Sequence, residues 1–443
     1  MCCCGACSTD VAPQQRSAMR ETDNPDAAYV TRNEALRMLA VKPATLYTYV
    51  SRGWIRRIAG RGRKPSLYLR EDVDRVRGRS NARAAAGILA GGAMRYGEPI
   101  VPTSITEISA QGPIYRTRGA VPLADAGLKF EVVAELLWSG RLLEFRPWRV
   151  GSVPETVRKV AGELRRCRTS VDLHDAFALV TLAAGMARGS ALKRTTAGVT
   201  PVLAARQLIL LLTGCFGFLT SPHGYRVPRS GESVAEAVAA SLGAIPSPGV
   251  VRALNAALVL SADHELNPAT FVGRVAASSE THLHRCVTAA ICTNAGERIA
   301  QGCDRLEQFL RAPAALRAQV SRPSAMPLGT DATSTFGFNH PLYPNGDPRA
   351  RWLLQMIRDT RRGSVRQRTM FDYLDTMRDR HKQYPRFELA LALLTTALRL
   401  PPGAAGGIYT LGRVAGWVAH ISEQRLAGFL IRPRAKFIGT IAE

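Results

Sequence analysis

Apolar residues recur at helical spacing along most of the chain. Segments rich in Ala, Leu and Val, with Pro and Gly at their borders, predict helices. These segments span residues 154–166, 171–188, 201–219, 232–242, 249–262, 268–295, 387–399 and 405–427. Strand-like alternation is scarce after residue 96, and we find no Gly-rich phosphate-binding loop in that sequence. We therefore expect a mainly α-helical body from residue 96 onward, long enough to bury a large core in two packed subdomains.

Residues 29–79 have a different pattern. Thr31 and Glu34 are spaced as a capping box in front of a first short helix. Pro43 suits the first turn of a second helix, and Gly53 can end that helix in a left-handed conformation. Two short helices joined by a tight turn predict a helix-turn-helix.

Two short strands are predicted after this pair of helices, at residues 54–58 and 66–69. Between them lies a tip rich in Gly and Arg at residues 60–64, which would place cations against phosphates. The whole pattern resembles a MerR-like or excisionase-like winged helix-turn-helix. We expect residues 80–95 to form a linker to the helical body.

The resemblance implies a DNA-binding surface on this small domain. Thr45, Tyr47, Thr48 and Arg52 would face the major groove, and Arg61, Arg63 and Lys64 would contact the phosphate backbone. A docking or dimerisation module with a solvated basic face is the alternative interpretation.

The charge balance supports a polyanionic partner. The 443 residues carry a net charge of +24, while 46% hydrophobic and 21% charged residues are ordinary for a globular protein. Residues 29–95 hold fifteen Lys and Arg against four Asp and Glu, a net charge of +11. Nearly half of the excess charge therefore lies in about a seventh of the chain, where duplex DNA is the expected partner.

Four of the nine cysteines lie within the first seven residues. No Cys or His follows them at zinc-finger spacing, so we predict no metal site and expect residues 1–28 to be disordered, with Met1 or Met19 as the initiator. The sequence shows no signal peptide, and the apolar run Leu208–Leu219 is too short to cross a bilayer. We expect a cytoplasmic protein without a membrane partner.

Motifs spread over residues 96–440 resemble those of citrate synthases, in the family's order. They lie at Ser104–Ile108, Phe130–Gly140, Asp263–Phe271, Gly337–Ala350, Leu411–Arg413 and Ile431–Arg434. With the front domain, the chain resembles a bacterial branch that carries a helix-turn-helix. The resemblance implies a citrate-synthase-like fold of large and small helical domains in residues 96–443, the small domain at roughly 268–385, and a homodimer.

The resemblance also implies a reaction. Acetyl-CoA, or propionyl-CoA in the 2-methylcitrate variant, would condense with oxaloacetate and water to give citrate or 2-methylcitrate and CoA, without a bound cofactor. His264 matches the histidine that binds oxaloacetate, His340 the one that polarises its ketone, and Glu388 stands where the catalytic aspartate is found. Arg349, Arg413 and Arg432 match the arginines that bind substrate carboxylates, the last from the partner subunit.

Other interpretations of His264 are a zinc-binding helix and a core histidine. The zinc motif His-Glu-x-x-His would need a second histidine where Asn267 stands.

Several positions depart from the family pattern, which has Pro-Asn-Val-Asp-Phe where this chain reads Pro385-Arg386-Phe387-Glu388-Leu389. Ile299 occupies the place of the histidine that stabilises the enol, and losing one such donor lowers the rate by about 10²–10³. Glu297 and Gln301 are nearby polar residues, but neither has the register of that histidine. Glu388 is one methylene longer than aspartate, and Asn339 stands where a glycine is usual.

Two functional hypotheses follow. The chain is either a citrate or 2-methylcitrate synthase with weakened turnover, or a non-catalytic DNA-binding transcriptional regulator that uses its helical body as a carboxylate sensor and dimeriser.

Overall fold

The chain divides into two units in the computed structural model, one of residues 1–99 with 436–443 and one of residues 100–435. The structure describes residues 29–39, 41–51, 55, 57–58, 66–70, 72–74, 76, 101–149, 151–167, 171–186, 201–312, 337–360 and 365–433. Residues 1–28 and 80–95, together with Arg52, Arg61, Arg63 and Lys64, lie outside the described residues.

The first unit combines short helices with a small antiparallel sheet. Its elements are β1 (Tyr29–Thr31), α1 (Arg32–Leu39), α2 (Pro43–Ser51), β2 (Arg57–Ile58) and β3 (Leu67–Leu69), and the strand order is β1-β3-β2. The capping box is confirmed, because the Thr31 N–H donates to Glu34 Oε2 at 2.8 Å and the Glu34 N–H donates to Thr31 Oγ1 at 3.4 Å. Strand β1 was not predicted, since three residues are too few to show alternation.

A small apolar core holds this unit together. Its buried residues come from both helices, the sheet and the segment that follows it: Val30, Ala35, Leu39, Leu46, Ile55, Tyr68, Val73 and Val76. Leu46 faces this core from α2, whereas Tyr47 and Thr48 on the same helix are exposed.

The second unit, hereafter the body, begins with a three-stranded meander. Strands β4 (Thr106–Ser109), β5 (Gly112–Tyr115) and β6 (Arg118–Gly119) pair antiparallel in sequence order. Gly112 has a φ of 105°, which favours glycine at the end of the β4–β5 turn. The meander leads into α4 (Ala120–Asp125) and α5 (Phe130–Ser139).

The rest of the body is helical, as the sequence predicts. The elements are α6 (Glu155–Arg166), α7 (Leu173–Met186), α8 (Pro201–Thr213), η3 (Gly214–Leu219), α9 (Val234–Ser241), α10 (Pro248–Ser261), α11 (Pro268–Ser278), α12 (Leu283–Asn294), α13 (Ala300–Arg311), α15 (Pro348–Thr360), α16 (Val365–His381), α17 (Phe387–Ala397) and α18 (Ala404–Ala427). The apolar segment 268–295 contains two helices, because the chain turns at Glu280 with a φ of 61°. Helices α13, α15 and α16 are not among the apolar segments predicted above, because they are rich in charged residues.

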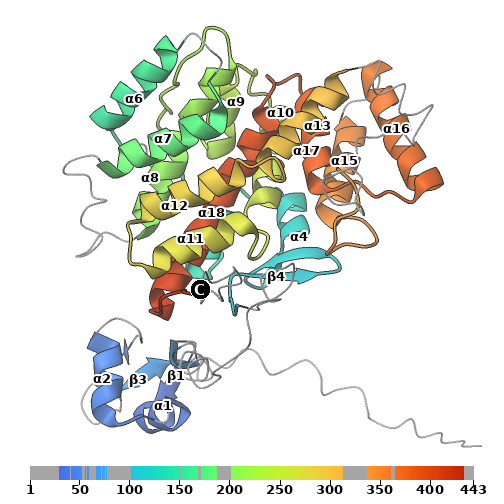
Figure 1. Cartoon of the computed structure of the whole chain (residues 1–443). Helices are drawn as coiled ribbons and strands as arrows, with labels where there is room; N and C mark the ends of the chain where they lie inside the picture. The colour runs from blue at the N-terminus through green and yellow to red at the C-terminus, as the bar shows by residue number, and fades with distance from the viewer. Residues whose placement is uncertain are drawn as a thin grey trace, which may run out of the picture. The chain divides into compact units, whose positions relative to one another are not determined.

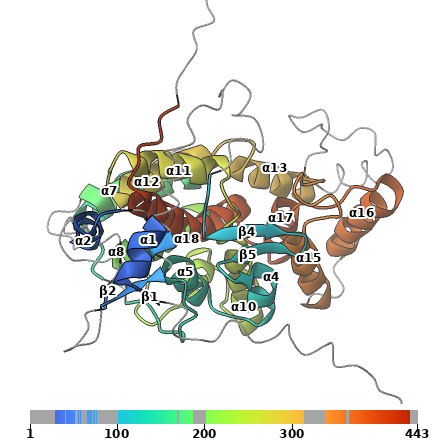
Figure 2. The ribbon, with the colours of Figure 1, turned by 90° about the horizontal axis from the view of Figure 1, so that it is seen from below.

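Helix α18 runs through the middle of the body and packs against α10, α11, α13 and α17 (Figure 1). The view from below shows the β4–β5 pair beside α4 and α10, while α16 lies at the edge (Figure 2). Glycines on α18 allow close approach to α10: a Cβ at Gly412 would lie 2.6 Å from Ser261 Cβ, and one at Gly416 would lie 2.2 Å from Asp263 Oδ1.

The segment Pro201–Leu219 is long and apolar enough to cross a bilayer by length and composition, but 72% of its 18-residue window is buried inside the body. That burial is typical of a core helix.

A buried carboxylate links three of these helices. Glu307 on α13 accepts a hydrogen bond from the Gly403 N–H at 2.7 Å, at the start of α18, and another from the Thr395 hydroxyl on α17. Arg311 lies 3.6 Å away. Burial raises the pKa of Glu307 to about 7, although these partners oppose the rise.

We predict that the stability of the body falls as the pH rises toward 8. The folded state binds the Glu307 proton more tightly than the unfolded chain does, so the stabilisation is complete below pH 4.5 and is lost through about pH 7. The change is at most about 3 kcal/mol, and Glu307→Gln should remove most of it. Urea unfolding between pH 5 and pH 8 measures the slope.

The matched control is Glu236→Gln in the capping box of α9, where hydrogen bonds from Ser233 lower the pKa. That variant should lose stability but keep the slope between pH 6 and pH 8. If Glu307→Gln keeps the slope of the natural chain, the prediction is wrong. A smaller residual slope is expected from Asp304, because burial raises its pKa to about 6.

Candidate active site

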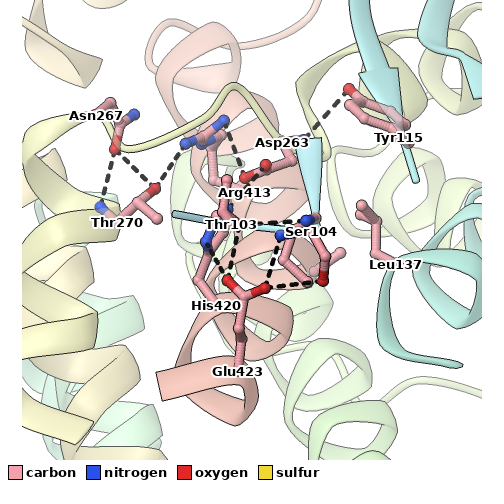
Figure 3. Close-up of polar contacts among 12 residues, drawn as sticks. Thr103, Ser104, Tyr115, Leu137, Asp263, Asn267, Thr270, Arg413, His420 and Glu423 are labelled. Atoms are coloured by element: carbon pink, nitrogen blue, oxygen red, sulfur yellow. Dashed lines mark hydrogen bonds and ion pairs between the residues drawn. The ribbon is translucent and has the colours of Figure 1, made fainter. Parts of the chain in front are cut away.

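The loop between α10 and α11 carries His264 and is held by buried polar contacts (Figure 3). The Asp263 N–H donates to Tyr115 Oη at 3.3 Å, and that hydroxyl donates to the Val259 carbonyl at 3.0 Å. His420 Nε2 lies 3.1 Å from Asp263 Oδ2. Burial alone would raise the pKa of Asp263, but His420 and Arg413 hold it below its ordinary value.

Arg413 faces the same loop from α18 and is completely buried (Figure 3). Its Nη2 donates to Thr270 Oγ1 at 2.9 Å, and its Nη1 lies 3.6 Å from Asp263 Oδ1. Among the described residues, Arg413 Nε and Nη1 have no hydrogen-bond partner. Buried guanidinium groups are normally satisfied, so these N–H groups suit an anionic ligand.

A short motif at the start of α11 fixes the position of Thr270. Asn267 caps the helix by accepting from the Thr270 N–H and from its hydroxyl, both at 2.9 Å, and Pro268 follows in the first turn. The cap therefore orients the Thr270 hydroxyl, which accepts the hydrogen bond from Arg413.

Two histidines meet at this loop. The rings of His264 and His340 have centroids 5.2 Å apart, and His264 Nε2 lies 3.0 Å from Tyr343 Oη. Burial, followed by the positive charge of Arg349, lowers the pKa of His264 well below its ordinary value. His264 is therefore neutral at pH 7.

The contacts of His340 define its tautomer. The Leu342 N–H donates to His340 Nδ1 at 3.1 Å, so this nitrogen is unprotonated and Nε2 carries the proton. Burial lowers the pKa of His340, and the charge of Glu388 only partly opposes this fall. A neutral His340 can donate one hydrogen bond from Nε2.

Arg349 is buried at the start of α15 beside a carboxylate. Its Nε and Nη2 donate to the two oxygens of Asp347 at 3.1 and 2.7 Å, and its guanidinium carbon lies 4.7 Å from the Phe387 ring centroid. Burial lowers the pKa of Arg349, but the charge of Asp347 more than reverses this effect. The pair is therefore charged and internally compensated.

Glu388 lies in the first turn of α17, and its charge acts on both His340 and Arg349. Its Oε2 is buried without a hydrogen-bond partner among the described residues. Ile299, at the start of α13, packs against the apolar core, and its N–H donates to the Gly296 carbonyl at 2.9 Å. The isoleucine side chain has no hydrogen-bond donor.

The structure thus brings five of the six residues predicted for the body's site into one cluster, hereafter the histidine cluster: His264, His340, Arg349, Glu388 and Arg413. Arg432 is exposed beyond the end of α18, and within the described chain no contact joins it to the cluster. Of the residues predicted to bind DNA, Thr45, Tyr47 and Thr48 lie on α2 of the other unit. In the part of the chain that the structure describes, no group of three His, Cys, Asp or Glu residues could hold a metal ion.

Several partners in the cluster were not predicted. Tyr343 contacts His264, Asp347 pairs with Arg349, and His420 contacts Asp263. Tyr343 and Asp347 lie within the Gly337–Ala350 motif, so the motif gave a signal for them. The only sequence signal for His420 is its spacing of seven residues from Arg413, which puts both residues on one helical face.

The profile of the family described as "Citrate synthase, C-terminal domain" matches residues 95–434. The chain belongs to the citrate synthase family. Citrate synthase 2 of Bacillus subtilis is 30% identical over 223 residues, which cover 48% of this chain and 58% of that protein. The 2-methylcitrate synthase of Shewanella oneidensis is 27% identical over 209 residues, covering 44% and 53%. The chain spans about half the length of the curated relatives it matches.

The fold agrees with this family. The citrate synthase of Thermoplasma acidophilum, solved in a ternary complex with carboxymethyl coenzyme A and oxaloacetate, superposes with a TM-score of 0.65 at 19% identity. The comparison covers 80% of this chain and 97% of that one. The mainly helical citrate-synthase-like fold predicted from the sequence is confirmed.

We predict that Asp347→Asn destabilises the body. The substitution leaves the Arg349 charge buried without its carboxylate, and losing one partner of a buried pair costs about 3–5 kcal/mol. Chemical unfolding at pH 7 measures the loss. The control is Asp379→Asn, which breaks the exposed pair with Arg378 and should cost much less, because solvent screens such pairs. Equal losses in the two variants would be evidence against a compensated Arg349 pair.

Proposed function

We propose that the body binds oxaloacetate and catalyses the citrate synthase reaction, with acetyl-CoA or propionyl-CoA as cosubstrate, at a reduced rate. The observation that carries this proposal is buried Arg413, whose Nε and Nη1 have no hydrogen-bond partner among the described residues although Nη1 lies in ion-pair range of Asp263, beside two neutral histidines. A substrate carboxylate would accept from Arg413, and Arg349 would support the site through its remaining nitrogen.

Glu388 would act as the base that removes a proton from the acyl methyl or methylene carbon. The resulting enol carbon would attack the ketone carbon of oxaloacetate, and His340 Nε2 would donate its proton to the ketone oxygen. Water would then cleave the thioester and release CoA. His264, which contacts Tyr343, would hold the oxaloacetate.

The reduced rate follows from Ile299. At this place a donor would stabilise the negative charge that develops on the thioester oxygen, and its loss lowers the rate by about 10²–10³. Ile299 therefore weakens activation of the acyl-CoA and leaves the oxaloacetate side of the site unchanged.

We expect calorimetry to detect oxaloacetate binding and a thiol assay to detect slow CoA release from acetyl-CoA or propionyl-CoA only when oxaloacetate is present. Ile299→His should raise this rate, by as much as about 10²-fold, because it restores a donor. Ile299→Ala is the matched control, since it removes bulk without adding a donor. Binding without any CoA release, in both the natural chain and Ile299→His, would refute the enzymatic proposal and favour a carboxylate sensor.

The body is proposed to work as a homodimer in the cytoplasm, its small domain at about residues 268–385. Support for dimerisation comes from α7, which exposes Leu179, Leu182 and Met186 at helical spacing. A second copy would cover this apolar stripe. It would also contribute Arg432, as the family resemblance implies.

We further propose that residues 29–79 form a winged helix-turn-helix that binds duplex DNA. The observation that favours this function is the asymmetry of α2, which buries Leu46 and exposes Tyr47 and Thr48. Arg32 lies over the Tyr47 ring at 5.3 Å, which adds a cation at the same surface.

Fluorescence anisotropy with a duplex from the gene's own promoter tests this proposal. We expect affinity to fall steeply with salt, and Arg61→Ala or Arg63→Ala to reduce the salt slope by about one each. Arg166→Ala on α6 is the control, because this exposed arginine belongs to the body and pairs with Glu163. Binding that is equal for random duplex, or unaffected by the two variants, would argue for a docking module.

A further inference from the structure

Two segments far apart in the sequence carry His340 and Glu388, and a short ladder joins them. The Asn339 N–H donates to the Tyr384 carbonyl at 2.8 Å, and the Arg386 N–H donates to the Gly337 carbonyl at 2.9 Å. Between these two bonds, Phe338 and Pro385 form an antiparallel bridge. The ladder ends one residue before His340 on one side and two residues before Glu388 on the other.

The side chains of Asn339 and Arg386 add four more hydrogen bonds to this ladder. Asn339 Oδ1 accepts from the Tyr384 N–H at 2.9 Å, and Asn339 Nδ2 donates to Gln383 Oε1 at 2.7 Å. Arg386 Nε donates to the Phe338 carbonyl at 2.8 Å, and Arg386 Nη2 donates to the Asn339 carbonyl at 3.0 Å. All four bonds cross between the two segments.

Both of these residues depart from the family pattern. Asn339 stands where a glycine is usual and keeps the left-handed backbone of that position, with a φ of 51°. Asparagine tolerates this conformation better than other residues that have a side chain. Arg386 stands where the family pattern has asparagine. The two departures contact each other, since Arg386 Nη2 binds the Asn339 carbonyl.

A third departure lies next to the ladder. Glu388 is one methylene longer than the aspartate of the family pattern, so the position of its carboxylate depends on where α17 begins. The ladder sets that starting point through Arg386, which precedes the helix as its cap residue.

We propose that Asn339 and Arg386 are positioning residues, which hold the Glu388 carboxylate at a fixed distance from His340. The inference rests on the proposed function, in which Glu388 is the base and His340 the proton donor. An error of about 1 Å in such a pair lowers a rate by about 10²-fold, so four extra hydrogen bonds that fix the spacing have a direct effect on turnover.

The test uses variants that keep the charge around His340. The charged groups that act on this ring are Glu388, Arg349, Asp347 and Arg386. Asn339→Gly removes two of the four side-chain bonds while keeping the backbone conformation, and Arg386→Lys keeps the charge but not the planar fork of donors. Arg425→Met is the control, because Arg425 makes a similar bond to the Thr281 carbonyl elsewhere in the body.

The first measurement is an NMR pH titration of histidines labelled at Cε1. The signal of His340 is assigned as the one that is missing in His340→Gln. Glu388→Gln should lower the pKa of His340 by about one unit, since it removes an adjacent negative charge. If the ladder positions Glu388, Asn339→Gly and Arg386→Lys should each lower the pKa of His340 in the same direction but by less than Glu388→Gln does, and Arg425→Met should leave it unchanged. A merely structural role predicts lower unfolding midpoints for both variants and an unchanged titration of His340.

The second measurement is kinetic. Asn339→Gly and Arg386→Lys should lower kcat for CoA release about 10- to 100-fold and leave the KM for oxaloacetate unchanged. If the natural chain releases no CoA, the proposed reaction fails, and the titration alone still decides the inference. The inference is overturned if Glu388→Gln moves the titration of His340 and the two ladder variants do not, or if Glu388→Gln itself has no effect.

Discussion

The buried pair of Asp263 and Arg413 is the interaction on which the arrangement of the body depends. Arg413, Gly416 and His420 lie on one face of α18, and all three meet the Asp263 carboxylate. The carboxylate reaches this face only because Gly416 has no side chain. Since Asp263 precedes His264, the contact that joins α10 to α18 also places the first histidine of the cluster.

The cluster has two sides that differ in how closely they keep the family pattern. The side around Asp263 keeps the family pattern. Its buried contacts run from Asn267 to Thr270, from Thr270 to Arg413 and from Arg413 to Asp263. Glu388 departs from the family pattern, as does Ile299 at the start of α13. Two further departures, Asn339 and Arg386, are not independent of each other, because they share a hydrogen bond and directly precede His340 and α17.

The sequence predicts most of the helices, because Ala and Leu repeat at helical spacing and Pro or Ser marks where helices such as α10 begin. It predicts the cluster only through motifs, since His264, His340 and Arg413 come from segments about 75 residues apart. The meander β4–β6 was missed because four-residue strands give too short an alternation. Periodicity cannot predict the ladder, because it joins two short non-helical segments far apart in the sequence. The contact between Asn339 and Arg386 is seen only in the structure.

The charges within the cluster limit how it can bind a substrate. Asp347 compensates Arg349, Asp263 lies beside Arg413, and Glu388 acts on His340 together with the opposite charge of Arg386, so these six charges sum to zero while both histidines are neutral. A dicarboxylate would add two negative charges that these groups do not balance, and burying uncompensated charge is costly. A further cation is therefore needed from outside the cluster. Arg432 is exposed and has no contact with the cluster within the described part of its own chain, so a second copy is the natural source of this charge. In the homodimer proposed above, binding of the small substrate and pairing of the two chains would then be one coupled equilibrium.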